Sequence, residues 1–169
     1  MDRREQYEQG IVDTSDGKPP CNFDEPAPCP IEPATAQHQS YWVLSDAERA
    51  RGFVRPVRDT YRHVGPPGPQ FPLRDLTAEE QQRFGPSIAY VKYEPYPKSD
   101  SSIVGRYWTQ GQLDAAGQGC GAVTKMGNSI AETYARDPRF YGSTFCVQCR
   151  THLPVDEFVW DGTTERVGS

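Results

Sequence analysis

Near its carboxyl end the chain reads Cys146-Val147-Gln148-Cys149-Arg150-Thr151-His152-Leu153-Pro154. Two cysteines separated by two residues, on a tight turn that leaves a short strand, place both sulfur atoms on the same side of the backbone. A soft metal ion needs this arrangement, and the spacing is typical of half a zinc site. The segment therefore predicts a zinc ion that joins this turn to another part of the chain.

A tetrahedral zinc ion needs four ligands, so two more must come from elsewhere in the chain. Cys120 is the best third ligand, because a glycine on each side frees its backbone. The fourth is His63 or His152. His152 lies three residues after Cys149, which would force a cramped loop, whereas His63 ends a separate predicted strand and would give a long-range crosslink. The spacing favours His63 and keeps His152 as the alternative.

Two other interpretations of these cysteines stay open. In the first, Cys120, Cys146 and Cys149 are reduced, buried thiols and the histidines are surface residues. In the second, the zinc ion is catalytic, with three protein ligands, a water molecule and a carboxylate as general base. Glu157 and Asp156 are close in sequence, but alternation along a predicted strand would point one of them away. We expect a structural ion.

The composition predicts one small domain with a lean core. The chain has 169 residues, of which 36% are hydrophobic, and it contains 15 glycines and 16 prolines. This length suits one ordinary domain, and the glycines and prolines predict that turns and irregular chain outweigh regular structure. A core of this kind gains stability from a metal crosslink between distant segments.

The net charge of −5 belongs to the amino-terminal end of the chain. Residues 1–40 hold eight acidic side chains against three basic ones, so the remainder is neutral and an anionic partner for it is not excluded. The same stretch holds six prolines and few large hydrophobic residues. It predicts a flexible acidic arm. Cys21 and Cys29 within it are read as plain thiols, with a second metal pair as the alternative.

The chain shows no sign of a membrane association. It lacks a run of about 20 apolar residues, and its start, Met1 to Gln6, lacks the apolar region of a secretion signal. We therefore expect a cytoplasmic protein without a membrane partner. In that reducing compartment, an odd number of five cysteines that includes a Cys-x-x-Cys pair is explained better by metal binding than by disulfides.

Local signals predict an α+β domain over residues 41–169, with a short antiparallel sheet, a few short helices and a loop-rich lobe inserted at 66–118. Ser45 with Glu48 forms a capping box for a helix over 46–51, and Thr77 with Glu80 forms a second one. Further helices are expected at 78–84, 109–116 and 128–136, and strands at 53–57, 61–64 and 88–93. Residues 144–146 and 155–160 are expected to pair, with the cysteine turn between them.

Five arginines fall within fourteen residues and are interleaved with Phe53 and Tyr61: Arg49, Arg51, Arg55, Arg58 and Arg62. Guanidinium groups beside aromatic rings suit phosphates and bases, so the row is a candidate nucleic-acid or nucleotide site. The alternative is an ordinary solvated surface, because nearby carboxylates can neutralise part of the row.

The chain contains GCGAVTKMG at 119–127, AETYARDPRFYG at 131–142 and FCVQCRTHLPVDEFVW at 145–160. Together with residues 42–45 and 52–58, these stretches resemble a family of small zinc-binding proteins found mostly in tailed phages and prophages. The resemblance implies a phage-encoded protein acting in the host cytoplasm. In shorter relatives a Tyr-x-His-Val element leads almost directly into the Cys-Gly turn, which implies that 66–118 is an optional insertion and that His63 lies beside Cys120. The family implies no particular activity.

A weaker likeness links the cysteine turn to the zinc knuckles of phage endonuclease VII-like nucleases, but their second cysteine pair and their His-Asn element do not follow Cys149. Phosphate loops, Gly-x-Ser-x-Gly and dinucleotide fingerprints are also missing from the sequence. We therefore expect a non-enzymatic protein that binds a host or phage macromolecule. The alternatives are nucleic-acid or nucleotide binding through the arginine row and a zinc-dependent hydrolase or nuclease. An enzyme would use Glu157, or Glu132 with Thr124 and Lys125.

Overall fold

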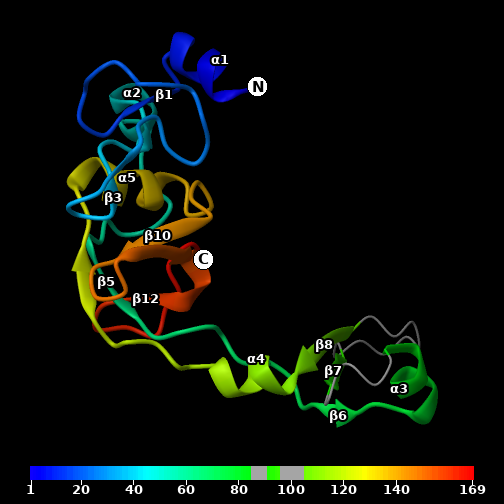
Figure 1. Cartoon of the computed structure of the whole chain (residues 1–169). Coiled ribbons are helices and arrows are strands. Elements are labelled where there is room, and N and C mark those ends of the chain that lie inside the picture. The colour runs from blue at the N-terminus through cyan, green and yellow to red at the C-terminus, as the bar shows by residue number, and fades with distance from the viewer. Residues whose placement is uncertain (85–90, 96–104) are drawn as a thin grey trace. The chain divides into compact units, whose positions relative to one another are not determined.

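The computed structural model describes residues 1–84, 91–95 and 105–169 (Figure 1). The chain forms two compact units: Met1–Val64 together with Cys120–Ser169, and Gly65–Gly119. The second unit covers the lobe expected at 66–118. The regular elements of the described part of the chain are short helices and short antiparallel sheets, so it is a mixed α+β protein, as predicted.

The centre of the first unit is a three-stranded antiparallel sheet in the order β12 (Phe158–Trp160), β5 (Thr60–His63) and β9 (Val123–Lys125). The hairpin of β10 (Ser143–Cys146) and β11 (Thr151–Pro154) carries the cysteine turn. The predicted pairing of 144–146 with 155–160 is therefore wrong. After Pro154 a 3₁₀ turn, η1 (Val155–Glu157), redirects the chain, and β12 pairs with β5 instead.

Capping signals located the helices well. Ser45 caps α2 (Asp46–Arg49) by accepting from the Glu48 amide, and α5 (Asn128–Arg136) spans the predicted range, although Gly127 is its cap residue and gives no side-chain cap. In contrast, the strand predicted at 53–57 does not form. The Val54 and Arg55 amides both donate to the Ala135 carbonyl, which leaves no ladder for a strand.

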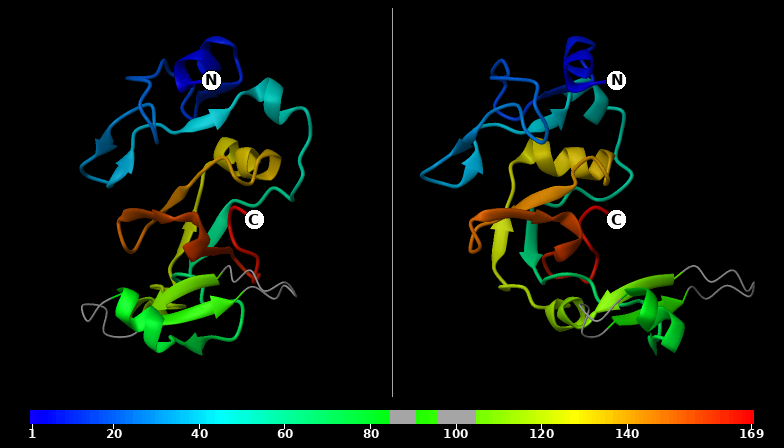
Figure 2. Two further views of the ribbon diagram at one scale, coloured as in Figure 1. Left: turned by 90° about the vertical axis from the view of Figure 1, so that its right-hand side faces the viewer. Right: turned by 45° about the vertical axis from the view of Figure 1, so that its right-hand side comes forward.

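The helix α5 lies between β4 (Trp42–Leu44) and the central sheet (Figure 2). Its Ala131 and Tyr134 join a buried cluster that also contains Cys146 and Phe158, so one of the predicted metal ligands is part of the hydrophobic core. The other members of the cluster are Tyr61, Met126, Trp160 and Val167. Core packing therefore fixes the position of the Cys146 sulfur atom.

The expectation of a flexible arm over residues 1–40 is not met. This stretch contains α1 (Arg3–Glu8), β1 (Val12–Thr14), β2 (Ile31–Glu32) and β3 (Gln37–His38), and β1 pairs with β4. Two aromatic residues of the stretch pack on one core side chain: the rings of Tyr7 and Phe23 lie 6.1 and 6.0 Å from that of the buried Trp42. The indole Nε1 of Trp42 also donates to the Asp24 carbonyl.

Cys21 and Cys29 form a disulfide, which corrects their interpretation as plain thiols or as a metal pair. The Asn22 amide donates to the Pro28 carbonyl at 3.0 Å and folds the segment back on itself. The Cα atoms of the two cysteines are thereby 5.0 Å apart. The spacing of the two cysteines in the sequence did not predict this turn.

The second unit has an antiparallel sheet in the order β6 (Arg74–Asp75), β7 (Val91–Pro95) and β8 (Gly105–Thr109). Its helices α3 (Ala78–Phe84) and α4 (Gln110–Ala115) confirm the predictions for 78–84 and 109–116, and Thr109 caps α4 through a capping box. The strand predicted at 88–93 overlaps β7, while its residues 88–90 lie outside the described residues.

We expect replacement of Thr133 by valine to lower the free energy of unfolding by about 1–3 kcal/mol. The Thr133 hydroxyl is fully buried; it accepts from the Leu44 amide at 3.1 Å and donates to the Ser129 carbonyl at 2.7 Å. Valine keeps the shape but leaves the buried Leu44 amide without its acceptor. Chemical denaturation measures the change. The same substitution at the exposed Thr151 is the control, and equal stability of both variants would contradict the prediction.

Candidate metal centre

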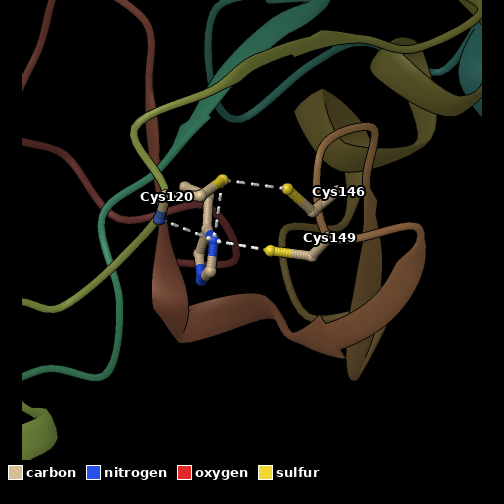
Figure 3. A group of neighbouring side chains, drawn as sticks. Cys120, Cys146 and Cys149 are labelled. Atoms are coloured by element: carbon tan, nitrogen blue, oxygen red, sulfur yellow. Dashed lines mark hydrogen bonds between the residues drawn. The ribbon is translucent and has the colours of Figure 1, made fainter.

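The structure brings together the four residues that the sequence favoured as ligands: His63, Cys120, Cys146 and Cys149. Their candidate ligand atoms all lie within 4.8 Å of one another. Figure 3 shows the three cysteine side chains converging from two directions, Cys120 from the segment before β9 and the other two from the hairpin turn. All four residues belong to the first unit. The alternative ligand, His152, is not part of the group.

The distances within the group suit tetrahedral coordination. The Cys120 sulfur is 3.4 Å from the Cys146 sulfur and 3.3 Å from Nδ1 of His63, and the Cys149 sulfur is 3.5 Å from the same nitrogen. A metal–sulfur bond of about 2.3 Å in a tetrahedron separates two sulfurs by about 3.8 Å. The group can therefore hold a metal ion after small movements of the side chains.

Backbone hydrogen bonds hold the two halves of the site. The His63 amide donates to the Ala122 carbonyl, and the Gly121 amide donates back to the His63 carbonyl at 2.9 Å. Gly121 has a φ of +75°, a conformation that glycine adopts at little cost. In the hairpin turn, the Arg150 amide donates to the Cys146 carbonyl at 2.8 Å. Each half is therefore shaped by the backbone, and the two halves meet at the ligand atoms.

Glu157 orients the histidine of the site. Its Oε2 lies 3.1 Å from Nε2 of His63, the ring nitrogen that faces away from the sulfurs, and both side chains are largely buried. A metal ion bound at Nδ1 would leave the proton on Nε2, and this N–H would donate a hydrogen bond to the Glu157 carboxylate. Such a partner fixes the ring and makes the metal-bound nitrogen more basic.

The contact between Glu157 and His63 was not predicted from the sequence. Glu157 was considered only as a general base on a strand. It lies in the 3₁₀ turn η1 instead, and the turn aims its carboxylate at His63. Alternation along an assumed strand gave no signal for this contact. Only the turn that follows Pro154 could have suggested it.

The thiols interact strongly with one another. Loss of water acts to raise the pKa of Cys120, but hydrogen bonds from the Ala122 amide, from His63 and from the other two thiols outweigh this effect and lower that pKa to about 7. For Cys149, desolvation and the two neighbouring sulfurs act in the same direction and raise the pKa to about 12. Near neutral pH the Cys120 thiol is therefore partly ionised whereas Cys149 stays protonated, and a cation that binds there must displace the remaining protons.

His152 lies in a separate aromatic group. Its Nε2 is 3.1 Å from the Tyr41 hydroxyl, and its ring centre is 5.1 Å from that of His38 and 5.3 Å from that of Phe145. Burial and the charge of His38 lower the pKa of His152, which favours the neutral ring. The side chain therefore helps to join the amino-terminal stretch to β11 rather than to bind the metal.

The arginine row is largely paired with carboxylates of the same chain. Side-chain ion pairs join Arg49 to Asp46 and Glu132, Arg51 to Glu48, Arg58 to Glu165, and Arg62 to Asp161. Arg55 donates to the Val54 and Ser169 backbone oxygens. These contacts favour the alternative of an ordinary solvated surface over a nucleic-acid or nucleotide site.

The second set of candidate catalytic residues does not form a site. Glu132 is bound by Arg49 and Asn128, and Lys125 pairs with Asp59 at 3.3 Å. The Thr124 hydroxyl accepts from the Val147 amide and so supports the cysteine turn. Each of these residues has a structural partner.

No family model, curated protein or solved structure matches this chain. Among the described residues, no helix has the length and apolar character needed to cross a membrane. The geometry of the site is therefore the main basis for a function.

We expect replacement of Glu157 by alanine to weaken metal binding by about 10- to 100-fold, because the His63 ring loses the carboxylate that orients it. Competition with a chromophoric chelator measures the affinity. The neighbouring Asp156 is exposed and is not a member of the ligand group among the described residues, so the same substitution there is a matched control and should leave the affinity unchanged. Equal affinities for the two variants would contradict the role of Glu157.

Proposed function

We propose that this chain is a zinc-stabilised, non-enzymatic binding protein whose target is a host or phage macromolecule. One observation carries the zinc-binding part of the proposal: three thiols and one imidazole converge within 4.8 Å, and together they can supply the four ligands of a tetrahedral ion. Soft thiolate and imidazole ligands favour zinc over hard cations such as Mg²⁺ and Ca²⁺. A full set of protein ligands is typical of structural zinc sites.

The position of the ligands supports a structural role. The ion would crosslink β5, the turn before β9 and the β10–β11 hairpin, three segments that are far apart in the sequence. The chain has a lean core, so such a crosslink contributes a large share of its stability. A phage source and a cytoplasmic location belong to the same proposal. The resemblance of residues 119–160 to phage proteins supports the source, whereas the Cys21–Cys29 disulfide does not favour a reducing compartment.

The alternatives have less support. A zinc hydrolase needs an open coordination position and a carboxylate near the bound water. Here the fourth position is taken by His63, and Glu157 is directed at the far side of that ring. Binding of nucleic acid needs available guanidinium groups, and four of the five arginines in the row are paired with carboxylates.

Elemental analysis of purified protein tests the proposal. We expect one zinc ion per chain in the wild type, loss of most of it in a His63→Gln variant and full retention in His152→Gln. The two histidines form a matched pair, because only His63 lies among the cysteines. Wild-type protein without zinc after purification in zinc-containing medium would refute the proposal, as would equal zinc content in the two variants.

A further inference from the structure

Between α2 and β5 the chain exposes three large hydrophobic side chains within five residues. The exposed fractions are 47% for Phe53, 54% for Val54 and 42% for Val57. A single exposed hydrophobic residue needs no explanation, but three within five residues mark this stretch as a candidate interaction site. We call this group, with the intervening Arg55 and Pro56, the apolar segment.

The backbone of the apolar segment is anchored although its side chains are exposed. The Val54 and Arg55 amides donate to the Ala135 carbonyl at 2.8 and 3.0 Å, at the carboxyl end of α5. Arg136 donates to the Gly52 carbonyl at 3.3 Å. A partner would therefore meet a segment that is already positioned, and less conformational entropy is lost on binding.

Two positive charges next to the apolar segment lack a side-chain carboxylate partner among the described residues. In the described part of the chain, Arg55 donates to the Val54 carbonyl and to a main-chain oxygen of Ser169, the last residue of the sequence. Arg136 donates to the carbonyl of Gly52, the residue before Phe53. The arginines on either side, Arg51 and Arg58, are paired with Glu48 and Glu165. The segment is thus a hydrophobic stretch beside two guanidinium groups that no side-chain carboxylate of the described residues pairs, on a chain whose net charge is −5.

We propose that the apolar segment binds a peptide segment of a partner protein in which a large hydrophobic side chain is flanked by carboxylates. The hydrophobic residue would cover Phe53 and Val57, and the carboxylates would meet Arg55 and Arg136. This inference rests on the proposed function, since it assigns a surface and a partner chemistry to a binding protein.

Two other occupants fit less well. Nucleic acid would bring phosphates against three hydrophobic side chains, two of which are aliphatic and cannot stack on bases. A second copy of the chain across a two-fold axis would place the same patch on both sides and bring Arg55 close to its own counterpart.

A display library of random twelve-residue peptides tests the proposal. It is selected on the zinc-loaded wild type and counter-selected on a Phe53→Ser/Val57→Ser variant. We expect enriched peptides with one large hydrophobic residue and at least two acidic residues beside it. In fluorescence anisotropy, these peptides should bind the double variant at least about tenfold more weakly and Arg55→Ala about threefold more weakly. Ile31→Ser is the matched control, because Ile31 is also 50% exposed but lies in β2.

Several results would overturn the inference: no enrichment, enrichment of basic or uncharged peptides, or equal binding by the double variant. Displacement of the peptide by oligothymidine would indicate nucleic acid instead. Self-association of the wild type that the double variant abolishes would indicate a second copy. Zinc content is measured in every sample, so wild type that carries zinc but enriches no peptide refutes this surface alone, while protein without zinc refutes the proposed function.

Discussion

Removal of the metal should unfold the first unit. We expect the Cys146→Ser variant, and the wild type treated with a strong chelator, to lose on the order of 5 kcal/mol or more of unfolding free energy, because the binding energy of a structural zinc ion is folding energy. Cys146 has no exposed surface and belongs to the hydrophobic core, so its loss also leaves a polar group in a buried position. Thermal unfolding followed by circular dichroism, with and without chelator, measures the effect.

A Cys21→Ser/Cys29→Ser variant is the control, because it removes two cysteines that are not metal ligands. These residues form the disulfide and are not among the ligands, so the variant should keep its metal.

Acid should act in the same direction as the chelator. Because binding displaces protons from the thiols, the affinity falls as the pH decreases through and below the pKa of about 7 at Cys120. A chelated protein with an unchanged melting temperature would contradict the prediction.

Replacement of Trp42 by alanine should cost about 3–5 kcal/mol, the usual range for truncating a buried aromatic side chain. The indole is 1% exposed, contacts Tyr7 and Phe23, and donates to the Asp24 carbonyl. We expect the amino-terminal stretch to detach first and to become sensitive to proteases, while the metal stays bound.

Limited proteolysis and elemental analysis on the same sample check this order of events. The control is Phe53→Ala, which truncates an aromatic ring that is 47% exposed and should change stability by less than about 0.5 kcal/mol. If the Trp42 variant releases its metal at the same denaturant concentration at which the amino-terminal stretch is cleaved, the two parts unfold together and the prediction fails.

The residues that form the candidate site were predictable because their chemistry depends on side-chain type and local spacing. Cys146 and Cys149 share one turn, and the glycines beside Cys120 indicated a close approach of the backbone. His63 was preferred over His152 mainly because of the resemblance to shorter proteins, in which the corresponding element lies beside the Cys-Gly turn. Glu157 was not predictable as a partner of His63, since its direction depends on a 3₁₀ turn that breaks the expected strand.

The sequence was less informative where tertiary contacts decide the structure. Residues 1–40 have few hydrophobic side chains, and composition alone indicated a flexible arm. Their order comes from contacts that composition does not show: the packing of Tyr7 and Phe23 on Trp42, the pairing of β1 with β4 and the Cys21–Cys29 disulfide. The strand expected at 53–57 failed for a similar reason, because the free carbonyl of Ala135 at the end of α5 takes two of its amides. Neither contact leaves a periodic signal in the sequence.

The second unit begins two residues after His63 and ends directly before Cys120. One ion that binds both residues would therefore fix the distance between the entry and exit points of everything inserted there. The entropy of closing a loop grows slowly with its length, by about 0.6 kcal/mol for each doubling. Chains of very different size can thus be exchanged at this position with little effect on the part that carries them, which makes it a natural point for grafting new recognition modules.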